Sequence, residues 1–388
     1  MQVLSSEPRR APVGGVLFSY GFRPFFLGAG LLAAVALPLW VAMYTGLIAL
    51  PGSADALRWH MHEMLFGYLG AALSGFLLTA VPNWTRRKPI AGTALAGLFG
   101  LWAAGRIAML SAGGSVAADL IAAAYPIVLA AVIWREVLAG GNRRNIPVCV
   151  FVSGFAAAQA LFLFGPQDLG LRLGLAMAVM MMMLIGGRVT PNFTANWFRQ
   201  SGRDLPPVPF GNADKAALVA GALAMASWIA TPETTVTGIL FLAAGVLNAW
   251  RLGRWHGAST LREPLVLVLH VAYAWLPVSF ALFAASILAP DWVMAQQPIH
   301  ALTAGAIGQM TLAVMTRASL GHSGRVLHAD VATTTAYVLV FLGAAGRVAS
   351  TWMPDPMTAL YLSAALWTGG YLAFLARFAP MLVSPRSD

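Results

Sequence analysis

Residues 58–81 read "RWHMHEMLFGYLGAALSGFLLTAV". The segment opens with ionisable side chains, and the 18 residues that follow Glu63 carry no charge. An uncharged apolar run of this length, wound as an α-helix, crosses a hydrocarbon core of roughly 30 Å. The segment therefore predicts a transmembrane helix with His60, His62 and Glu63 near its beginning.

Similar apolar runs recur along the chain of 388 residues, of which 59% are hydrophobic and 10% charged. Soluble proteins carry about 25% charged residues, so the composition excludes that class. We expect an all-α polytopic membrane protein: an N-terminal segment at 1–22, a single transmembrane domain at 23–379 with an inner loop at 191–213, and a tail at 380–388. Twelve helices are predicted near 23–48, 57–82, 90–110, 116–139, 146–164, 170–190, 214–230, 234–252, 263–289, 298–320, 331–353 and 356–378.

The distribution of Lys and Arg predicts the orientation of these helices. With the N-terminus in the cytoplasm, twenty cations fall on the inner side and only Arg58 and Arg172 on the outer side. This asymmetry follows the positive-inside rule, and it predicts that both termini are cytoplasmic. The net charge of +10 is explained by topology, so no nucleic-acid partner is expected. The single cysteine, Cys149, excludes an internal disulfide, and no C-x-x-C-H motif marks a c-type haem.

The two remaining cations, Arg106 and Arg347, stand in matching settings. They lie in "LFGLWAAGRIA" at 98–108 and "LVFLGAAGRVA" at 339–349, and histidines precede them in "WHMHE" and "QQPIHALTAG". Two further fragments match, "TAVPNWT" at 79–85 and "RVTPNFT" at 188–194. These matches indicate a unit of about four helices used three times.

Helical spacing divides the ionisable cluster of the second helix. Ser53 is the expected N-cap, which starts the helix near residue 54 and places the histidines within the outer leaflet. At about 100° per residue, His60 and Glu63 share a face, whereas His62 points to nearly the opposite side. The prediction is one His/Glu pair and one separate histidine on the same helix.

His300 follows Pro298 at the outer end of the tenth helix, where the repeat gives it the place of His60 or His62. Imidazoles from two helices can hold a haem iron, or Glu63 can join them around copper or non-haem iron. Arg106 and Arg347 at the same depth would then pair with haem propionates. The alternatives are interfacial histidines with snorkelling arginines, or an Arg106–Glu63 salt bridge that serves packing alone.

Two further histidines lie near the inner ends of their helices. His270 stands in "LVLHVAYAWLPV" and His322 in "MTRASLGHSGR". They are candidates for a second haem site or for a proton-handling pair, and hydrogen bonding within the core is an equal alternative. Gln159, Asn248 and Gln309 are expected to form interhelical hydrogen bonds.

Three stretches resemble the NnrS family: "LFSYGFRPFFLGAG" at 17–30, "WHMHEMLFGYLGAALSGFLLTAVPNWT" at 59–85 and "HALTAGAIGQMTLAVMTRASLGHSGR" at 300–325. The resemblance runs through nearly the whole chain, and F-R-P-F-F and W-H-x-H-E are its most specific motifs. It implies a twelve-helix protein of the bacterial inner membrane that binds haem, with copper as a second candidate metal, and that acts in the response to nitric oxide.

Three four-helix units with ligands on the second and tenth helices are also analogous to haem–copper oxidase catalytic subunits, although the H-P-x-x-Y copper motif is missing. We therefore expect a nitric oxide reductase with one or two b-type haems, supplied with electrons by quinol or a redox partner protein. Its ligands would be His60 or His62 with His300, and its catalytic groups Glu63, Arg106 and Arg347. The alternatives are a non-catalytic protein that binds NO or a metal nitrosyl, and a transporter.

Overall fold

The computed structural model describes residues 15–49, 51, 55–203 and 205–387, which form helices and no β-strand. Twelve helical spans are long and apolar enough to cross a membrane, which confirms the predicted number and the all-α fold. The elements follow one another as η1 (Val16–Phe18), α1 (Phe22–Tyr44), α2 (Ala56–His62), η2 (Glu63–Leu69), α3 (Gly70–Thr85), α4 (Thr93–Ala112), α5 (Val116–Ala139), η3 (Arg143–Asn145), α6 (Ile146–Phe164), α7 (Gln167–Met181), η4 (Met182–Gly186), α8 (Gly187–Gln200), α9 (Asn212–Ala230), α10 (Thr235–Gly253), η5 (Gly257–Thr260), α11 (Pro264–Leu288), α12 (Gln296–His300), η6 (Ala301–Gly308), α13 (Gln309–His322), α14 (Val331–Ala349), η7 (Ser350–Trp352) and α15 (Pro356–Val383).

Three spans contain a π-helical segment between two α-helices. These segments are η2, η4 and η6, and they interrupt the second, sixth and tenth spans. A π-helix bonds each amide to the carbonyl five residues back, is rare, and occurs frequently at functional sites. Their recurrence at every fourth span is the spacing that the predicted four-helix repeat requires.

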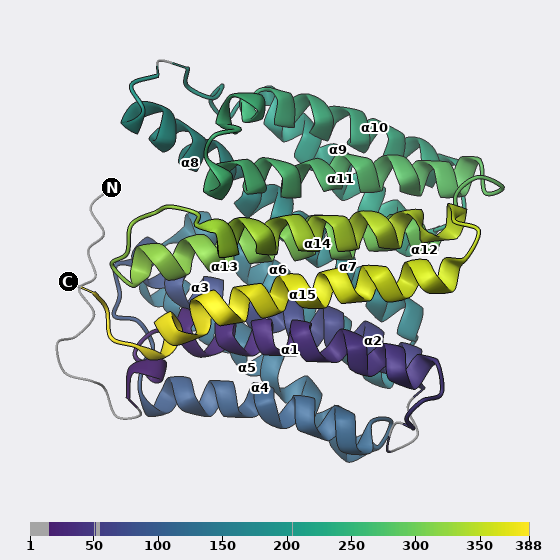
Figure 1. The fold of residues 1–388 in the computed structure, drawn as a ribbon, viewed down its shortest axis with the longest axis horizontal. Helices are drawn as coiled ribbons and strands as arrows, with labels where there is room; N and C mark the ends of the chain where they lie inside the picture. Colours follow the sequence, from purple (N-terminus) through teal and green to yellow (C-terminus); the bar gives the residue numbers. More distant parts are fainter. Residues whose placement is uncertain (1–14, 50, 52–54, 204, 388) are drawn as a thin grey trace. The chain divides into compact units, whose positions relative to one another are not determined.

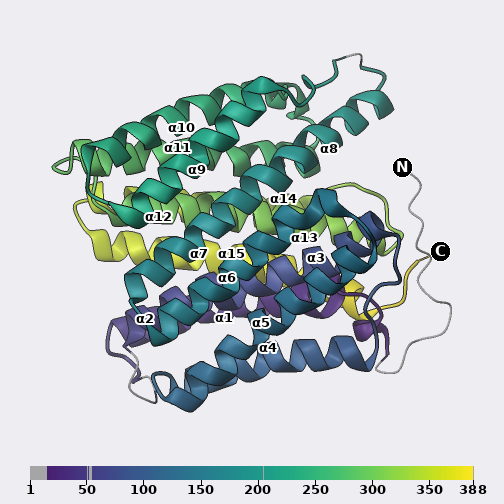
Figure 2. The ribbon, with the colours of Figure 1, turned by 180° about the vertical axis from the view of Figure 1, so that it is seen from behind.

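The chain divides into two compact units. Unit 1 contains residues 1–177, 315–327 and 371–388, and unit 2 contains residues 178–314 and 328–370. In unit 1, α5 packs against both α4 and α6, and α1 packs against α3 (Figure 2). In unit 2, α9, α10 and α11 lie side by side (Figure 1). The π-helical segment η6 packs against α11 and α14.

The F-R-P-F-F motif at the start of α1 builds part of the core of unit 1. Phe22, Phe25 and Phe26 are fully buried, and so is Arg23. The Nη1 atom of Arg23 donates hydrogen bonds to the carbonyl oxygens of Met381, Leu382 and Ser384, at 3.2, 2.9 and 2.7 Å. The last carbonyls of a helix have no partner within it, so Arg23 closes the end of α15.

The inner loop expected at 191–213 is shorter than predicted. Helix α8 continues through Pro191 as far as Gln200, and α9 begins at Asn212. Thr190, Thr194 and Phe198 recur every four residues and are all buried. This buried stripe keeps the segment helical despite its Pro and Asn residues. The proline follows the π-helical segment η4 by a few residues, at a place where regular α-helical bonding has only just resumed.

Candidate functional site

The helix that carries two of the predicted histidines begins two residues later than expected. Asp55 is the N-cap of α2, and its side chain accepts a hydrogen bond of 2.7 Å from the backbone N–H of Arg58. Ser53, the predicted cap, lies outside the described residues. A carboxylate satisfies an unpaired amide at a helix start as well as a serine does, and it also favours the positive end of the helix dipole.

Glu63 lies at the centre of a buried polar cluster in unit 1. Its Oε1 atom accepts hydrogen bonds from His62 Nδ1 at 2.9 Å and from Arg106 Nη1 at 2.8 Å. Glu63 is 1% exposed, His62 is fully buried and Arg106 is 9% exposed. The Arg106–Glu63 salt bridge, which the sequence offered as an alternative to propionate binding by Arg106, is present. A buried carboxylate with a cation and a second N–H donor on one oxygen is held in a fixed position.

Helical spacing favoured His60 as the partner of Glu63, whereas the histidine bonded to Glu63 Oε1 is its immediate neighbour His62. The glutamate side chain is long enough to reach the ring of the residue before it, and its carboxylate is held there by Arg106 as well. The ring of His60 stacks instead on Trp40 of α1, with ring centroids 4.2 Å apart. The two histidines thus have different neighbours, as expected, but with their roles exchanged.

Gln159 of α6 fixes the protonation of the His62 ring. Its Nε2 atom lies 3.0 Å from His62 Nε2 and 3.1 Å from the carbonyl oxygen of Ala122. A carbonyl only accepts, so the atom beside Ala122 must be the amide nitrogen, and its second N–H is donated to His62 Nε2. His62 Nε2 is then an acceptor, and Nδ1 carries the proton that is donated to Glu63. Both nitrogens of His62 are engaged inside the protein, and the predicted interhelical role of Gln159 is confirmed.

Helix α4 holds this cluster against the π-helical segment η2. Trp102 Nε1 donates a hydrogen bond of 3.0 Å to the carbonyl oxygen of Gly67. Arg106, one turn further along α4, lies so close that a Cβ atom on Gly67 would be 2.5 Å from its Nη1 and 3.0 Å from Glu63 Oε2. Only glycine leaves room for the ion pair at this position. Gly67 is therefore part of the site, which the sequence did not indicate.

Asp119 of α5 is a second buried carboxylate of the cluster, and sequence reasoning missed it. It is 5% exposed, its Oδ2 atom is 3.8 Å from Arg58 Nη2, and it is close enough to His62 for an electrostatic interaction. An acidic residue in the first turn of a helix is common as a partner of the helix dipole, so its position gave no signal. Its burial inside a predicted span was the feature that could have singled it out.

His300 in unit 2 has a different arrangement. Its Nδ1 atom is 2.7 Å from the carbonyl oxygen of Gln296, which can only accept, so Nδ1 carries the proton. The lone pair of the half-buried ring is thereby on Nε2. His300 also interacts electrostatically with Arg347, whose Nη1 donates to Ser350 Oγ at 2.8 Å. Gln297 Nε2 donates a hydrogen bond of 3.1 Å to the carbonyl oxygen of Val348, which joins this end of α12 to α14.

The two histidines predicted near the inner ends are placed in different units. His270 belongs to unit 2, where its Nε2 meets Thr194 Oγ1 at 2.8 Å and its Nδ1 faces Gly257, on which a Cβ would lie 2.6 Å away. His322 belongs to unit 1, where its ring packs between Tyr20 and Phe22 with both centroid distances 5.6 Å. Both environments match the predicted alternative of packing and hydrogen bonding within the core, and a ligand role stays a prediction.

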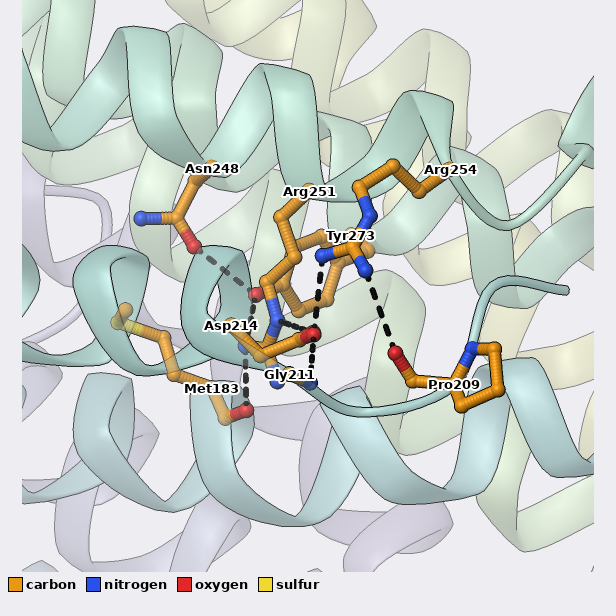
Figure 3. Close-up of polar contacts among 8 residues, drawn as sticks. All are labelled: Met183, Pro209, Gly211, Asp214, Asn248, Arg251, Arg254 and Tyr273. Atoms are coloured by element: carbon orange, nitrogen blue, oxygen red, sulfur yellow. Dashed lines mark hydrogen bonds and ion pairs between the residues drawn. The ribbon is translucent and has the colours of Figure 1, made fainter.

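Unit 2 contains a second buried ion pair set against a π-helical segment. Arg251 Nε donates a hydrogen bond of 2.9 Å to Asp214 Oδ1. Its Nη1 donates two more, one of 2.9 Å to the carbonyl oxygen of Met183 in η4 and one of 2.8 Å to Tyr273 Oη. The Tyr273 hydroxyl in turn donates a hydrogen bond of 2.9 Å to Asn248 Oδ1, which confirms the predicted interhelical role of Asn248. Figure 3 shows these side chains converging from α9, α10 and α11 on the Arg251 guanidinium. Sequence reasoning counted Arg251 only as a cation of the inner surface.

The chemistry that these groups can support depends on the number of ligands. Within the part of the chain that the structure describes, no three His, Cys, Asp or Glu side chains come together in a way that could hold a metal ion. A haem iron needs only one or two axial protein ligands. Single histidines of suitable protonation are therefore the groups to assess, and the His300 ring, with its Nδ1–H on a carbonyl, is held as ligating histidines are held.

The model of one family, described as NnrS protein, matches residues 16–386, nearly the whole chain. The chain belongs to the NnrS family. This membership connects the protein with the response to nitric oxide, and it confirms the resemblance seen in the three quoted stretches. No curated protein matched the sequence.

Proposed function

We propose that the protein binds b-type haem in the bacterial inner membrane, with both termini in the cytoplasm, and detoxifies nitric oxide. The reaction that we infer is reduction of two NO with two electrons and two protons to N2O and water. Family membership supports the connection with nitric oxide. A chain with one cysteine and no c-type haem motif is expected to receive electrons from quinol or from a redox partner protein.

The observation that carries the proposal is the protonation of His300. With its Nδ1–H donated to the carbonyl of Gln296 at 2.7 Å, the ring presents a basic Nε2 and cannot rotate freely. Histidines that ligate metals typically donate their other N–H to a carbonyl or carboxylate in this way. Bound haem would supply one-electron chemistry and a coordination position for NO. Arg347 would balance negative charge of a propionate beside it.

In unit 1 we assign the ligand role to His60 and leave His62 out of the ligand set. Each nitrogen of His62 already has a partner within 3.0 Å, and breaking those contacts would leave Gln159 and Glu63 with unsatisfied buried groups. His60 is half-buried, and its ring is held flat against Trp40. In this assignment His62 holds Glu63 in place, and Glu63 accepts and releases protons for the reaction.

Arg106 would act by electrostatics in the same site. Its guanidinium lies in a buried setting beside η2, where a fixed cation stabilises developing negative charge much more strongly than it does in water. An N–O species that gains electrons gains negative charge. Arg106 is therefore proposed to stabilise the reduced species, while the Glu63 carboxylate keeps the guanidinium oriented.

The test is the absorption spectrum of the purified protein and of four variants, oxidised and reduced, with a pyridine haemochrome assay for haem content. We expect His300→Ala and His60→Ala to lose haem or to shift the Soret band. His62→Gln and the exposed loop variant His328→Ala should keep the wild-type spectrum. Wild-type protein without haem, or normal spectra for both His300→Ala and His60→Ala, would overturn the proposal.

A second measurement separates catalysis from binding. Reduced protein in proteoliposomes is given quinol and NO, and NO is followed with an electrode while N2O is measured in the headspace. Sustained consumption with one N2O formed per two NO supports the reductase. Uptake of NO that stops at the haem concentration, with no N2O, would instead favour the non-catalytic NO-binding alternative.

A further inference from the structure

Six exposed cations gather at one end of α3, α5 and α6 in unit 1. The stretches 83–92 and 134–147 contain these six cations and one carboxylate, that of Glu136. The positive-inside rule explains where cations lie along the membrane normal, but not how they gather within one face of the membrane. We call the six cations the basic surface of unit 1, and they are Arg86, Arg87, Lys88, Arg135, Arg143 and Arg144.

A hydrogen bond joins the two connections that carry most of these cations. Asn142 Nδ2 donates a hydrogen bond of 2.6 Å to the carbonyl oxygen of Trp84. Arg86 lies two residues after Trp84, and Arg143 directly follows Asn142. The α3–α4 connection and the α5–α6 connection therefore lie side by side at this end of unit 1.

Glu136 holds two cations of the basic surface in place. Its Oε2 atom accepts a hydrogen bond of 2.6 Å from Arg87 Nε, and its Oε1 atom accepts one of 2.9 Å from Arg135 Nε. The ends of α3 and α5 are tightly packed here, since a Cβ atom on Gly140 would lie 2.5 Å from Thr85 Cβ. The single carboxylate is thus already used, and it ties the end of α5 to the connection after α3.

The other four cations have no anionic partner among the described residues. Their side chains form no hydrogen bond and no ion pair within the described part of the chain, and they are Arg86, Lys88, Arg143 and Arg144. In unit 2, by contrast, Arg251 and Arg254 share the carboxylate of Asp214. Neighbouring cations without a counter-charge repel one another, and an anion from outside the chain relieves that repulsion.

Away from this helix end, α5 and α6 expose apolar side chains. Val128 of α5 is 41% exposed, and it shares a face of the helix with Arg135, which lies seven residues later and about 10 Å along the axis. Val150, one turn into α6, is 50% exposed. Trp84 is half-buried, and tryptophan is enriched at membrane interfaces. Positive charge at the helix ends with apolar surface next to it matches a phospholipid better than a free anion, which has no apolar part.

We propose that the basic surface of unit 1 binds anionic phospholipid, with the phosphodiester on the four cations that lack a partner and the acyl chains along α5 and α6. Three of these four cations are arginines, whose guanidinium groups donate paired hydrogen bonds to phosphate. A zwitterionic headgroup carries an ammonium group that the same cations repel, so the surface selects lipids by net charge. Binding breaks no covalent bond and requires neither haem nor nitric oxide.

The test counts the lipids that stay bound to detergent-purified protein in native mass spectrometry. The protein is mixed with phosphatidylglycerol or with phosphatidylcholine of the same acyl chains, and wild-type protein should retain only the first. The surface variant carries four substitutions, Arg86→Gln, Lys88→Gln, Arg143→Gln and Arg144→Gln. The control variant loses the same charge from exposed cations in four separate segments, by Arg199→Gln, Lys215→Gln, Arg262→Gln and Arg325→Gln.

The two variants separate a local site from the overall charge of the protein. Each basic residue near an anionic membrane surface strengthens the attraction about fivefold, so the surface variant should bind phosphatidylglycerol about 10²-fold more weakly than wild type. The control variant should bind it as wild type does. Equal weakening in the two variants, or equal retention of the two lipids by wild-type protein, would overturn the proposal.

A fluorescence measurement keeps the test independent of whether the surface variant folds. Wild-type protein and Trp84→Phe are reconstituted in phosphatidylcholine that contains a small share of brominated phosphatidylglycerol or brominated phosphatidylcholine. The difference between the two proteins gives the emission of Trp84, which brominated phosphatidylglycerol should quench more strongly. Inorganic phosphate added at constant ionic strength should leave that preference unchanged. Equal quenching by the two lipids, or a preference that inorganic phosphate abolishes, would contradict a lipid site at this surface.

Discussion

His62 in unit 1 and His300 in unit 2 both stand directly before a π-helical segment and have different hydrogen-bond partners. Each is followed five residues later by a glycine, Gly67 or Gly305. Both rings carry their proton on Nδ1, which is donated to Glu63 in one case and to the carbonyl of Gln296 in the other. The difference lies at Nε2, which in His62 accepts from Gln159. Neighbouring side chains therefore decide whether a histidine holds a carboxylate or presents its lone pair.

The residue after each histidine differs in the same sense. Unit 1 has Glu63, which binds Arg106, whereas unit 2 has Ala301, a fully buried small residue. The glycines also meet different partners: a Cβ on Gly67 would strike the Arg106 guanidinium, whereas one on Gly305 would strike the Trp275 ring at 2.5 Å. Unit 1 thus uses the space beside its π-helical segment for an ion pair, and unit 2 uses it for an aromatic ring.

The largest effect is expected from removing Glu63, because the residue at the same place in unit 2 is Ala301. Glu63→Ala leaves Arg106 buried without its anion, which should destabilise the fold by about 3–5 kcal/mol because an unpaired buried charge remains. Thermal unfolding in detergent, followed by intrinsic fluorescence, measures the change. The exposed control Asp168→Ala should change stability by less than about 0.5 kcal/mol. If both variants unfold at the same temperature, the ion pair does not stabilise unit 1.

Replacing Gly67 or Gly305 by alanine tests whether η2 and η6 are equally tightly packed. Gly67→Ala and Gly305→Ala should each cost about 1–3 kcal/mol, because the new Cβ displaces a guanidinium or an indole ring. Gly97 of α4 has no atom within 4 Å of the position that a Cβ would take, so Gly97→Ala should be neutral or slightly stabilising. Gly305→Ala should also shift tryptophan emission, whereas an unchanged melting temperature in either π-helical variant would argue against the close approach.

The smallest effect on stability is expected from releasing the Nε2 atom of His62, which makes it resemble His300. Gln159→Leu removes two hydrogen bonds and should cost about 1–2 kcal/mol. In histidine-labelled protein, the nitrogen resonance of His62 Nε2 should move toward that of a ring nitrogen without a donor. Gln309→Leu is the matched control, because Gln309 is as buried as Gln159. Its Nε2 donates a hydrogen bond of 3.0 Å to the carbonyl oxygen of Tyr337, not to a histidine. A His62 resonance that moves equally in both variants would contradict the assigned protonation.

The fold was largely predictable from the sequence, because apolar runs and the positions of Lys and Arg report directly on membrane crossing. The three π-helical segments were not, since winding with one extra residue per turn leaves no pattern in residue types. They also place Gly67 beside the Arg106–Glu63 ion pair, a contact that the sequence did not indicate. The extension of α8 to Gln200 was hidden by Pro191 and by polar residues that the buried stripe outweighs.

The site was predictable only in its separate parts. The Arg106–Glu63 contact was one of the alternatives, because two opposite charges inside a bilayer tend to pair. Asp119 and Arg251 escaped notice because each lies near a helix end, where a charge is ordinarily explained by the helix dipole or by topology. Gln159 was recognised as a hydrogen-bonding residue, but its effect on the protonation of His62 depends on the carbonyl of Ala122, which no sequence pattern announces.

The contact between Arg23 and the end of α15 bears on how the protein is made. Arg23 lies in α1, and its acceptor Met381 lies 358 positions later in the chain. Unit 1 includes residues 371–388, so it cannot reach its final form before these residues have been synthesised. A message truncated by a late stop codon would yield a chain with nearly all of its helices and no Met381, Leu382 or Ser384 carbonyl for Arg23. Arg23 would then be buried without these three acceptors, so such a chain is expected to fold less stably than the full one.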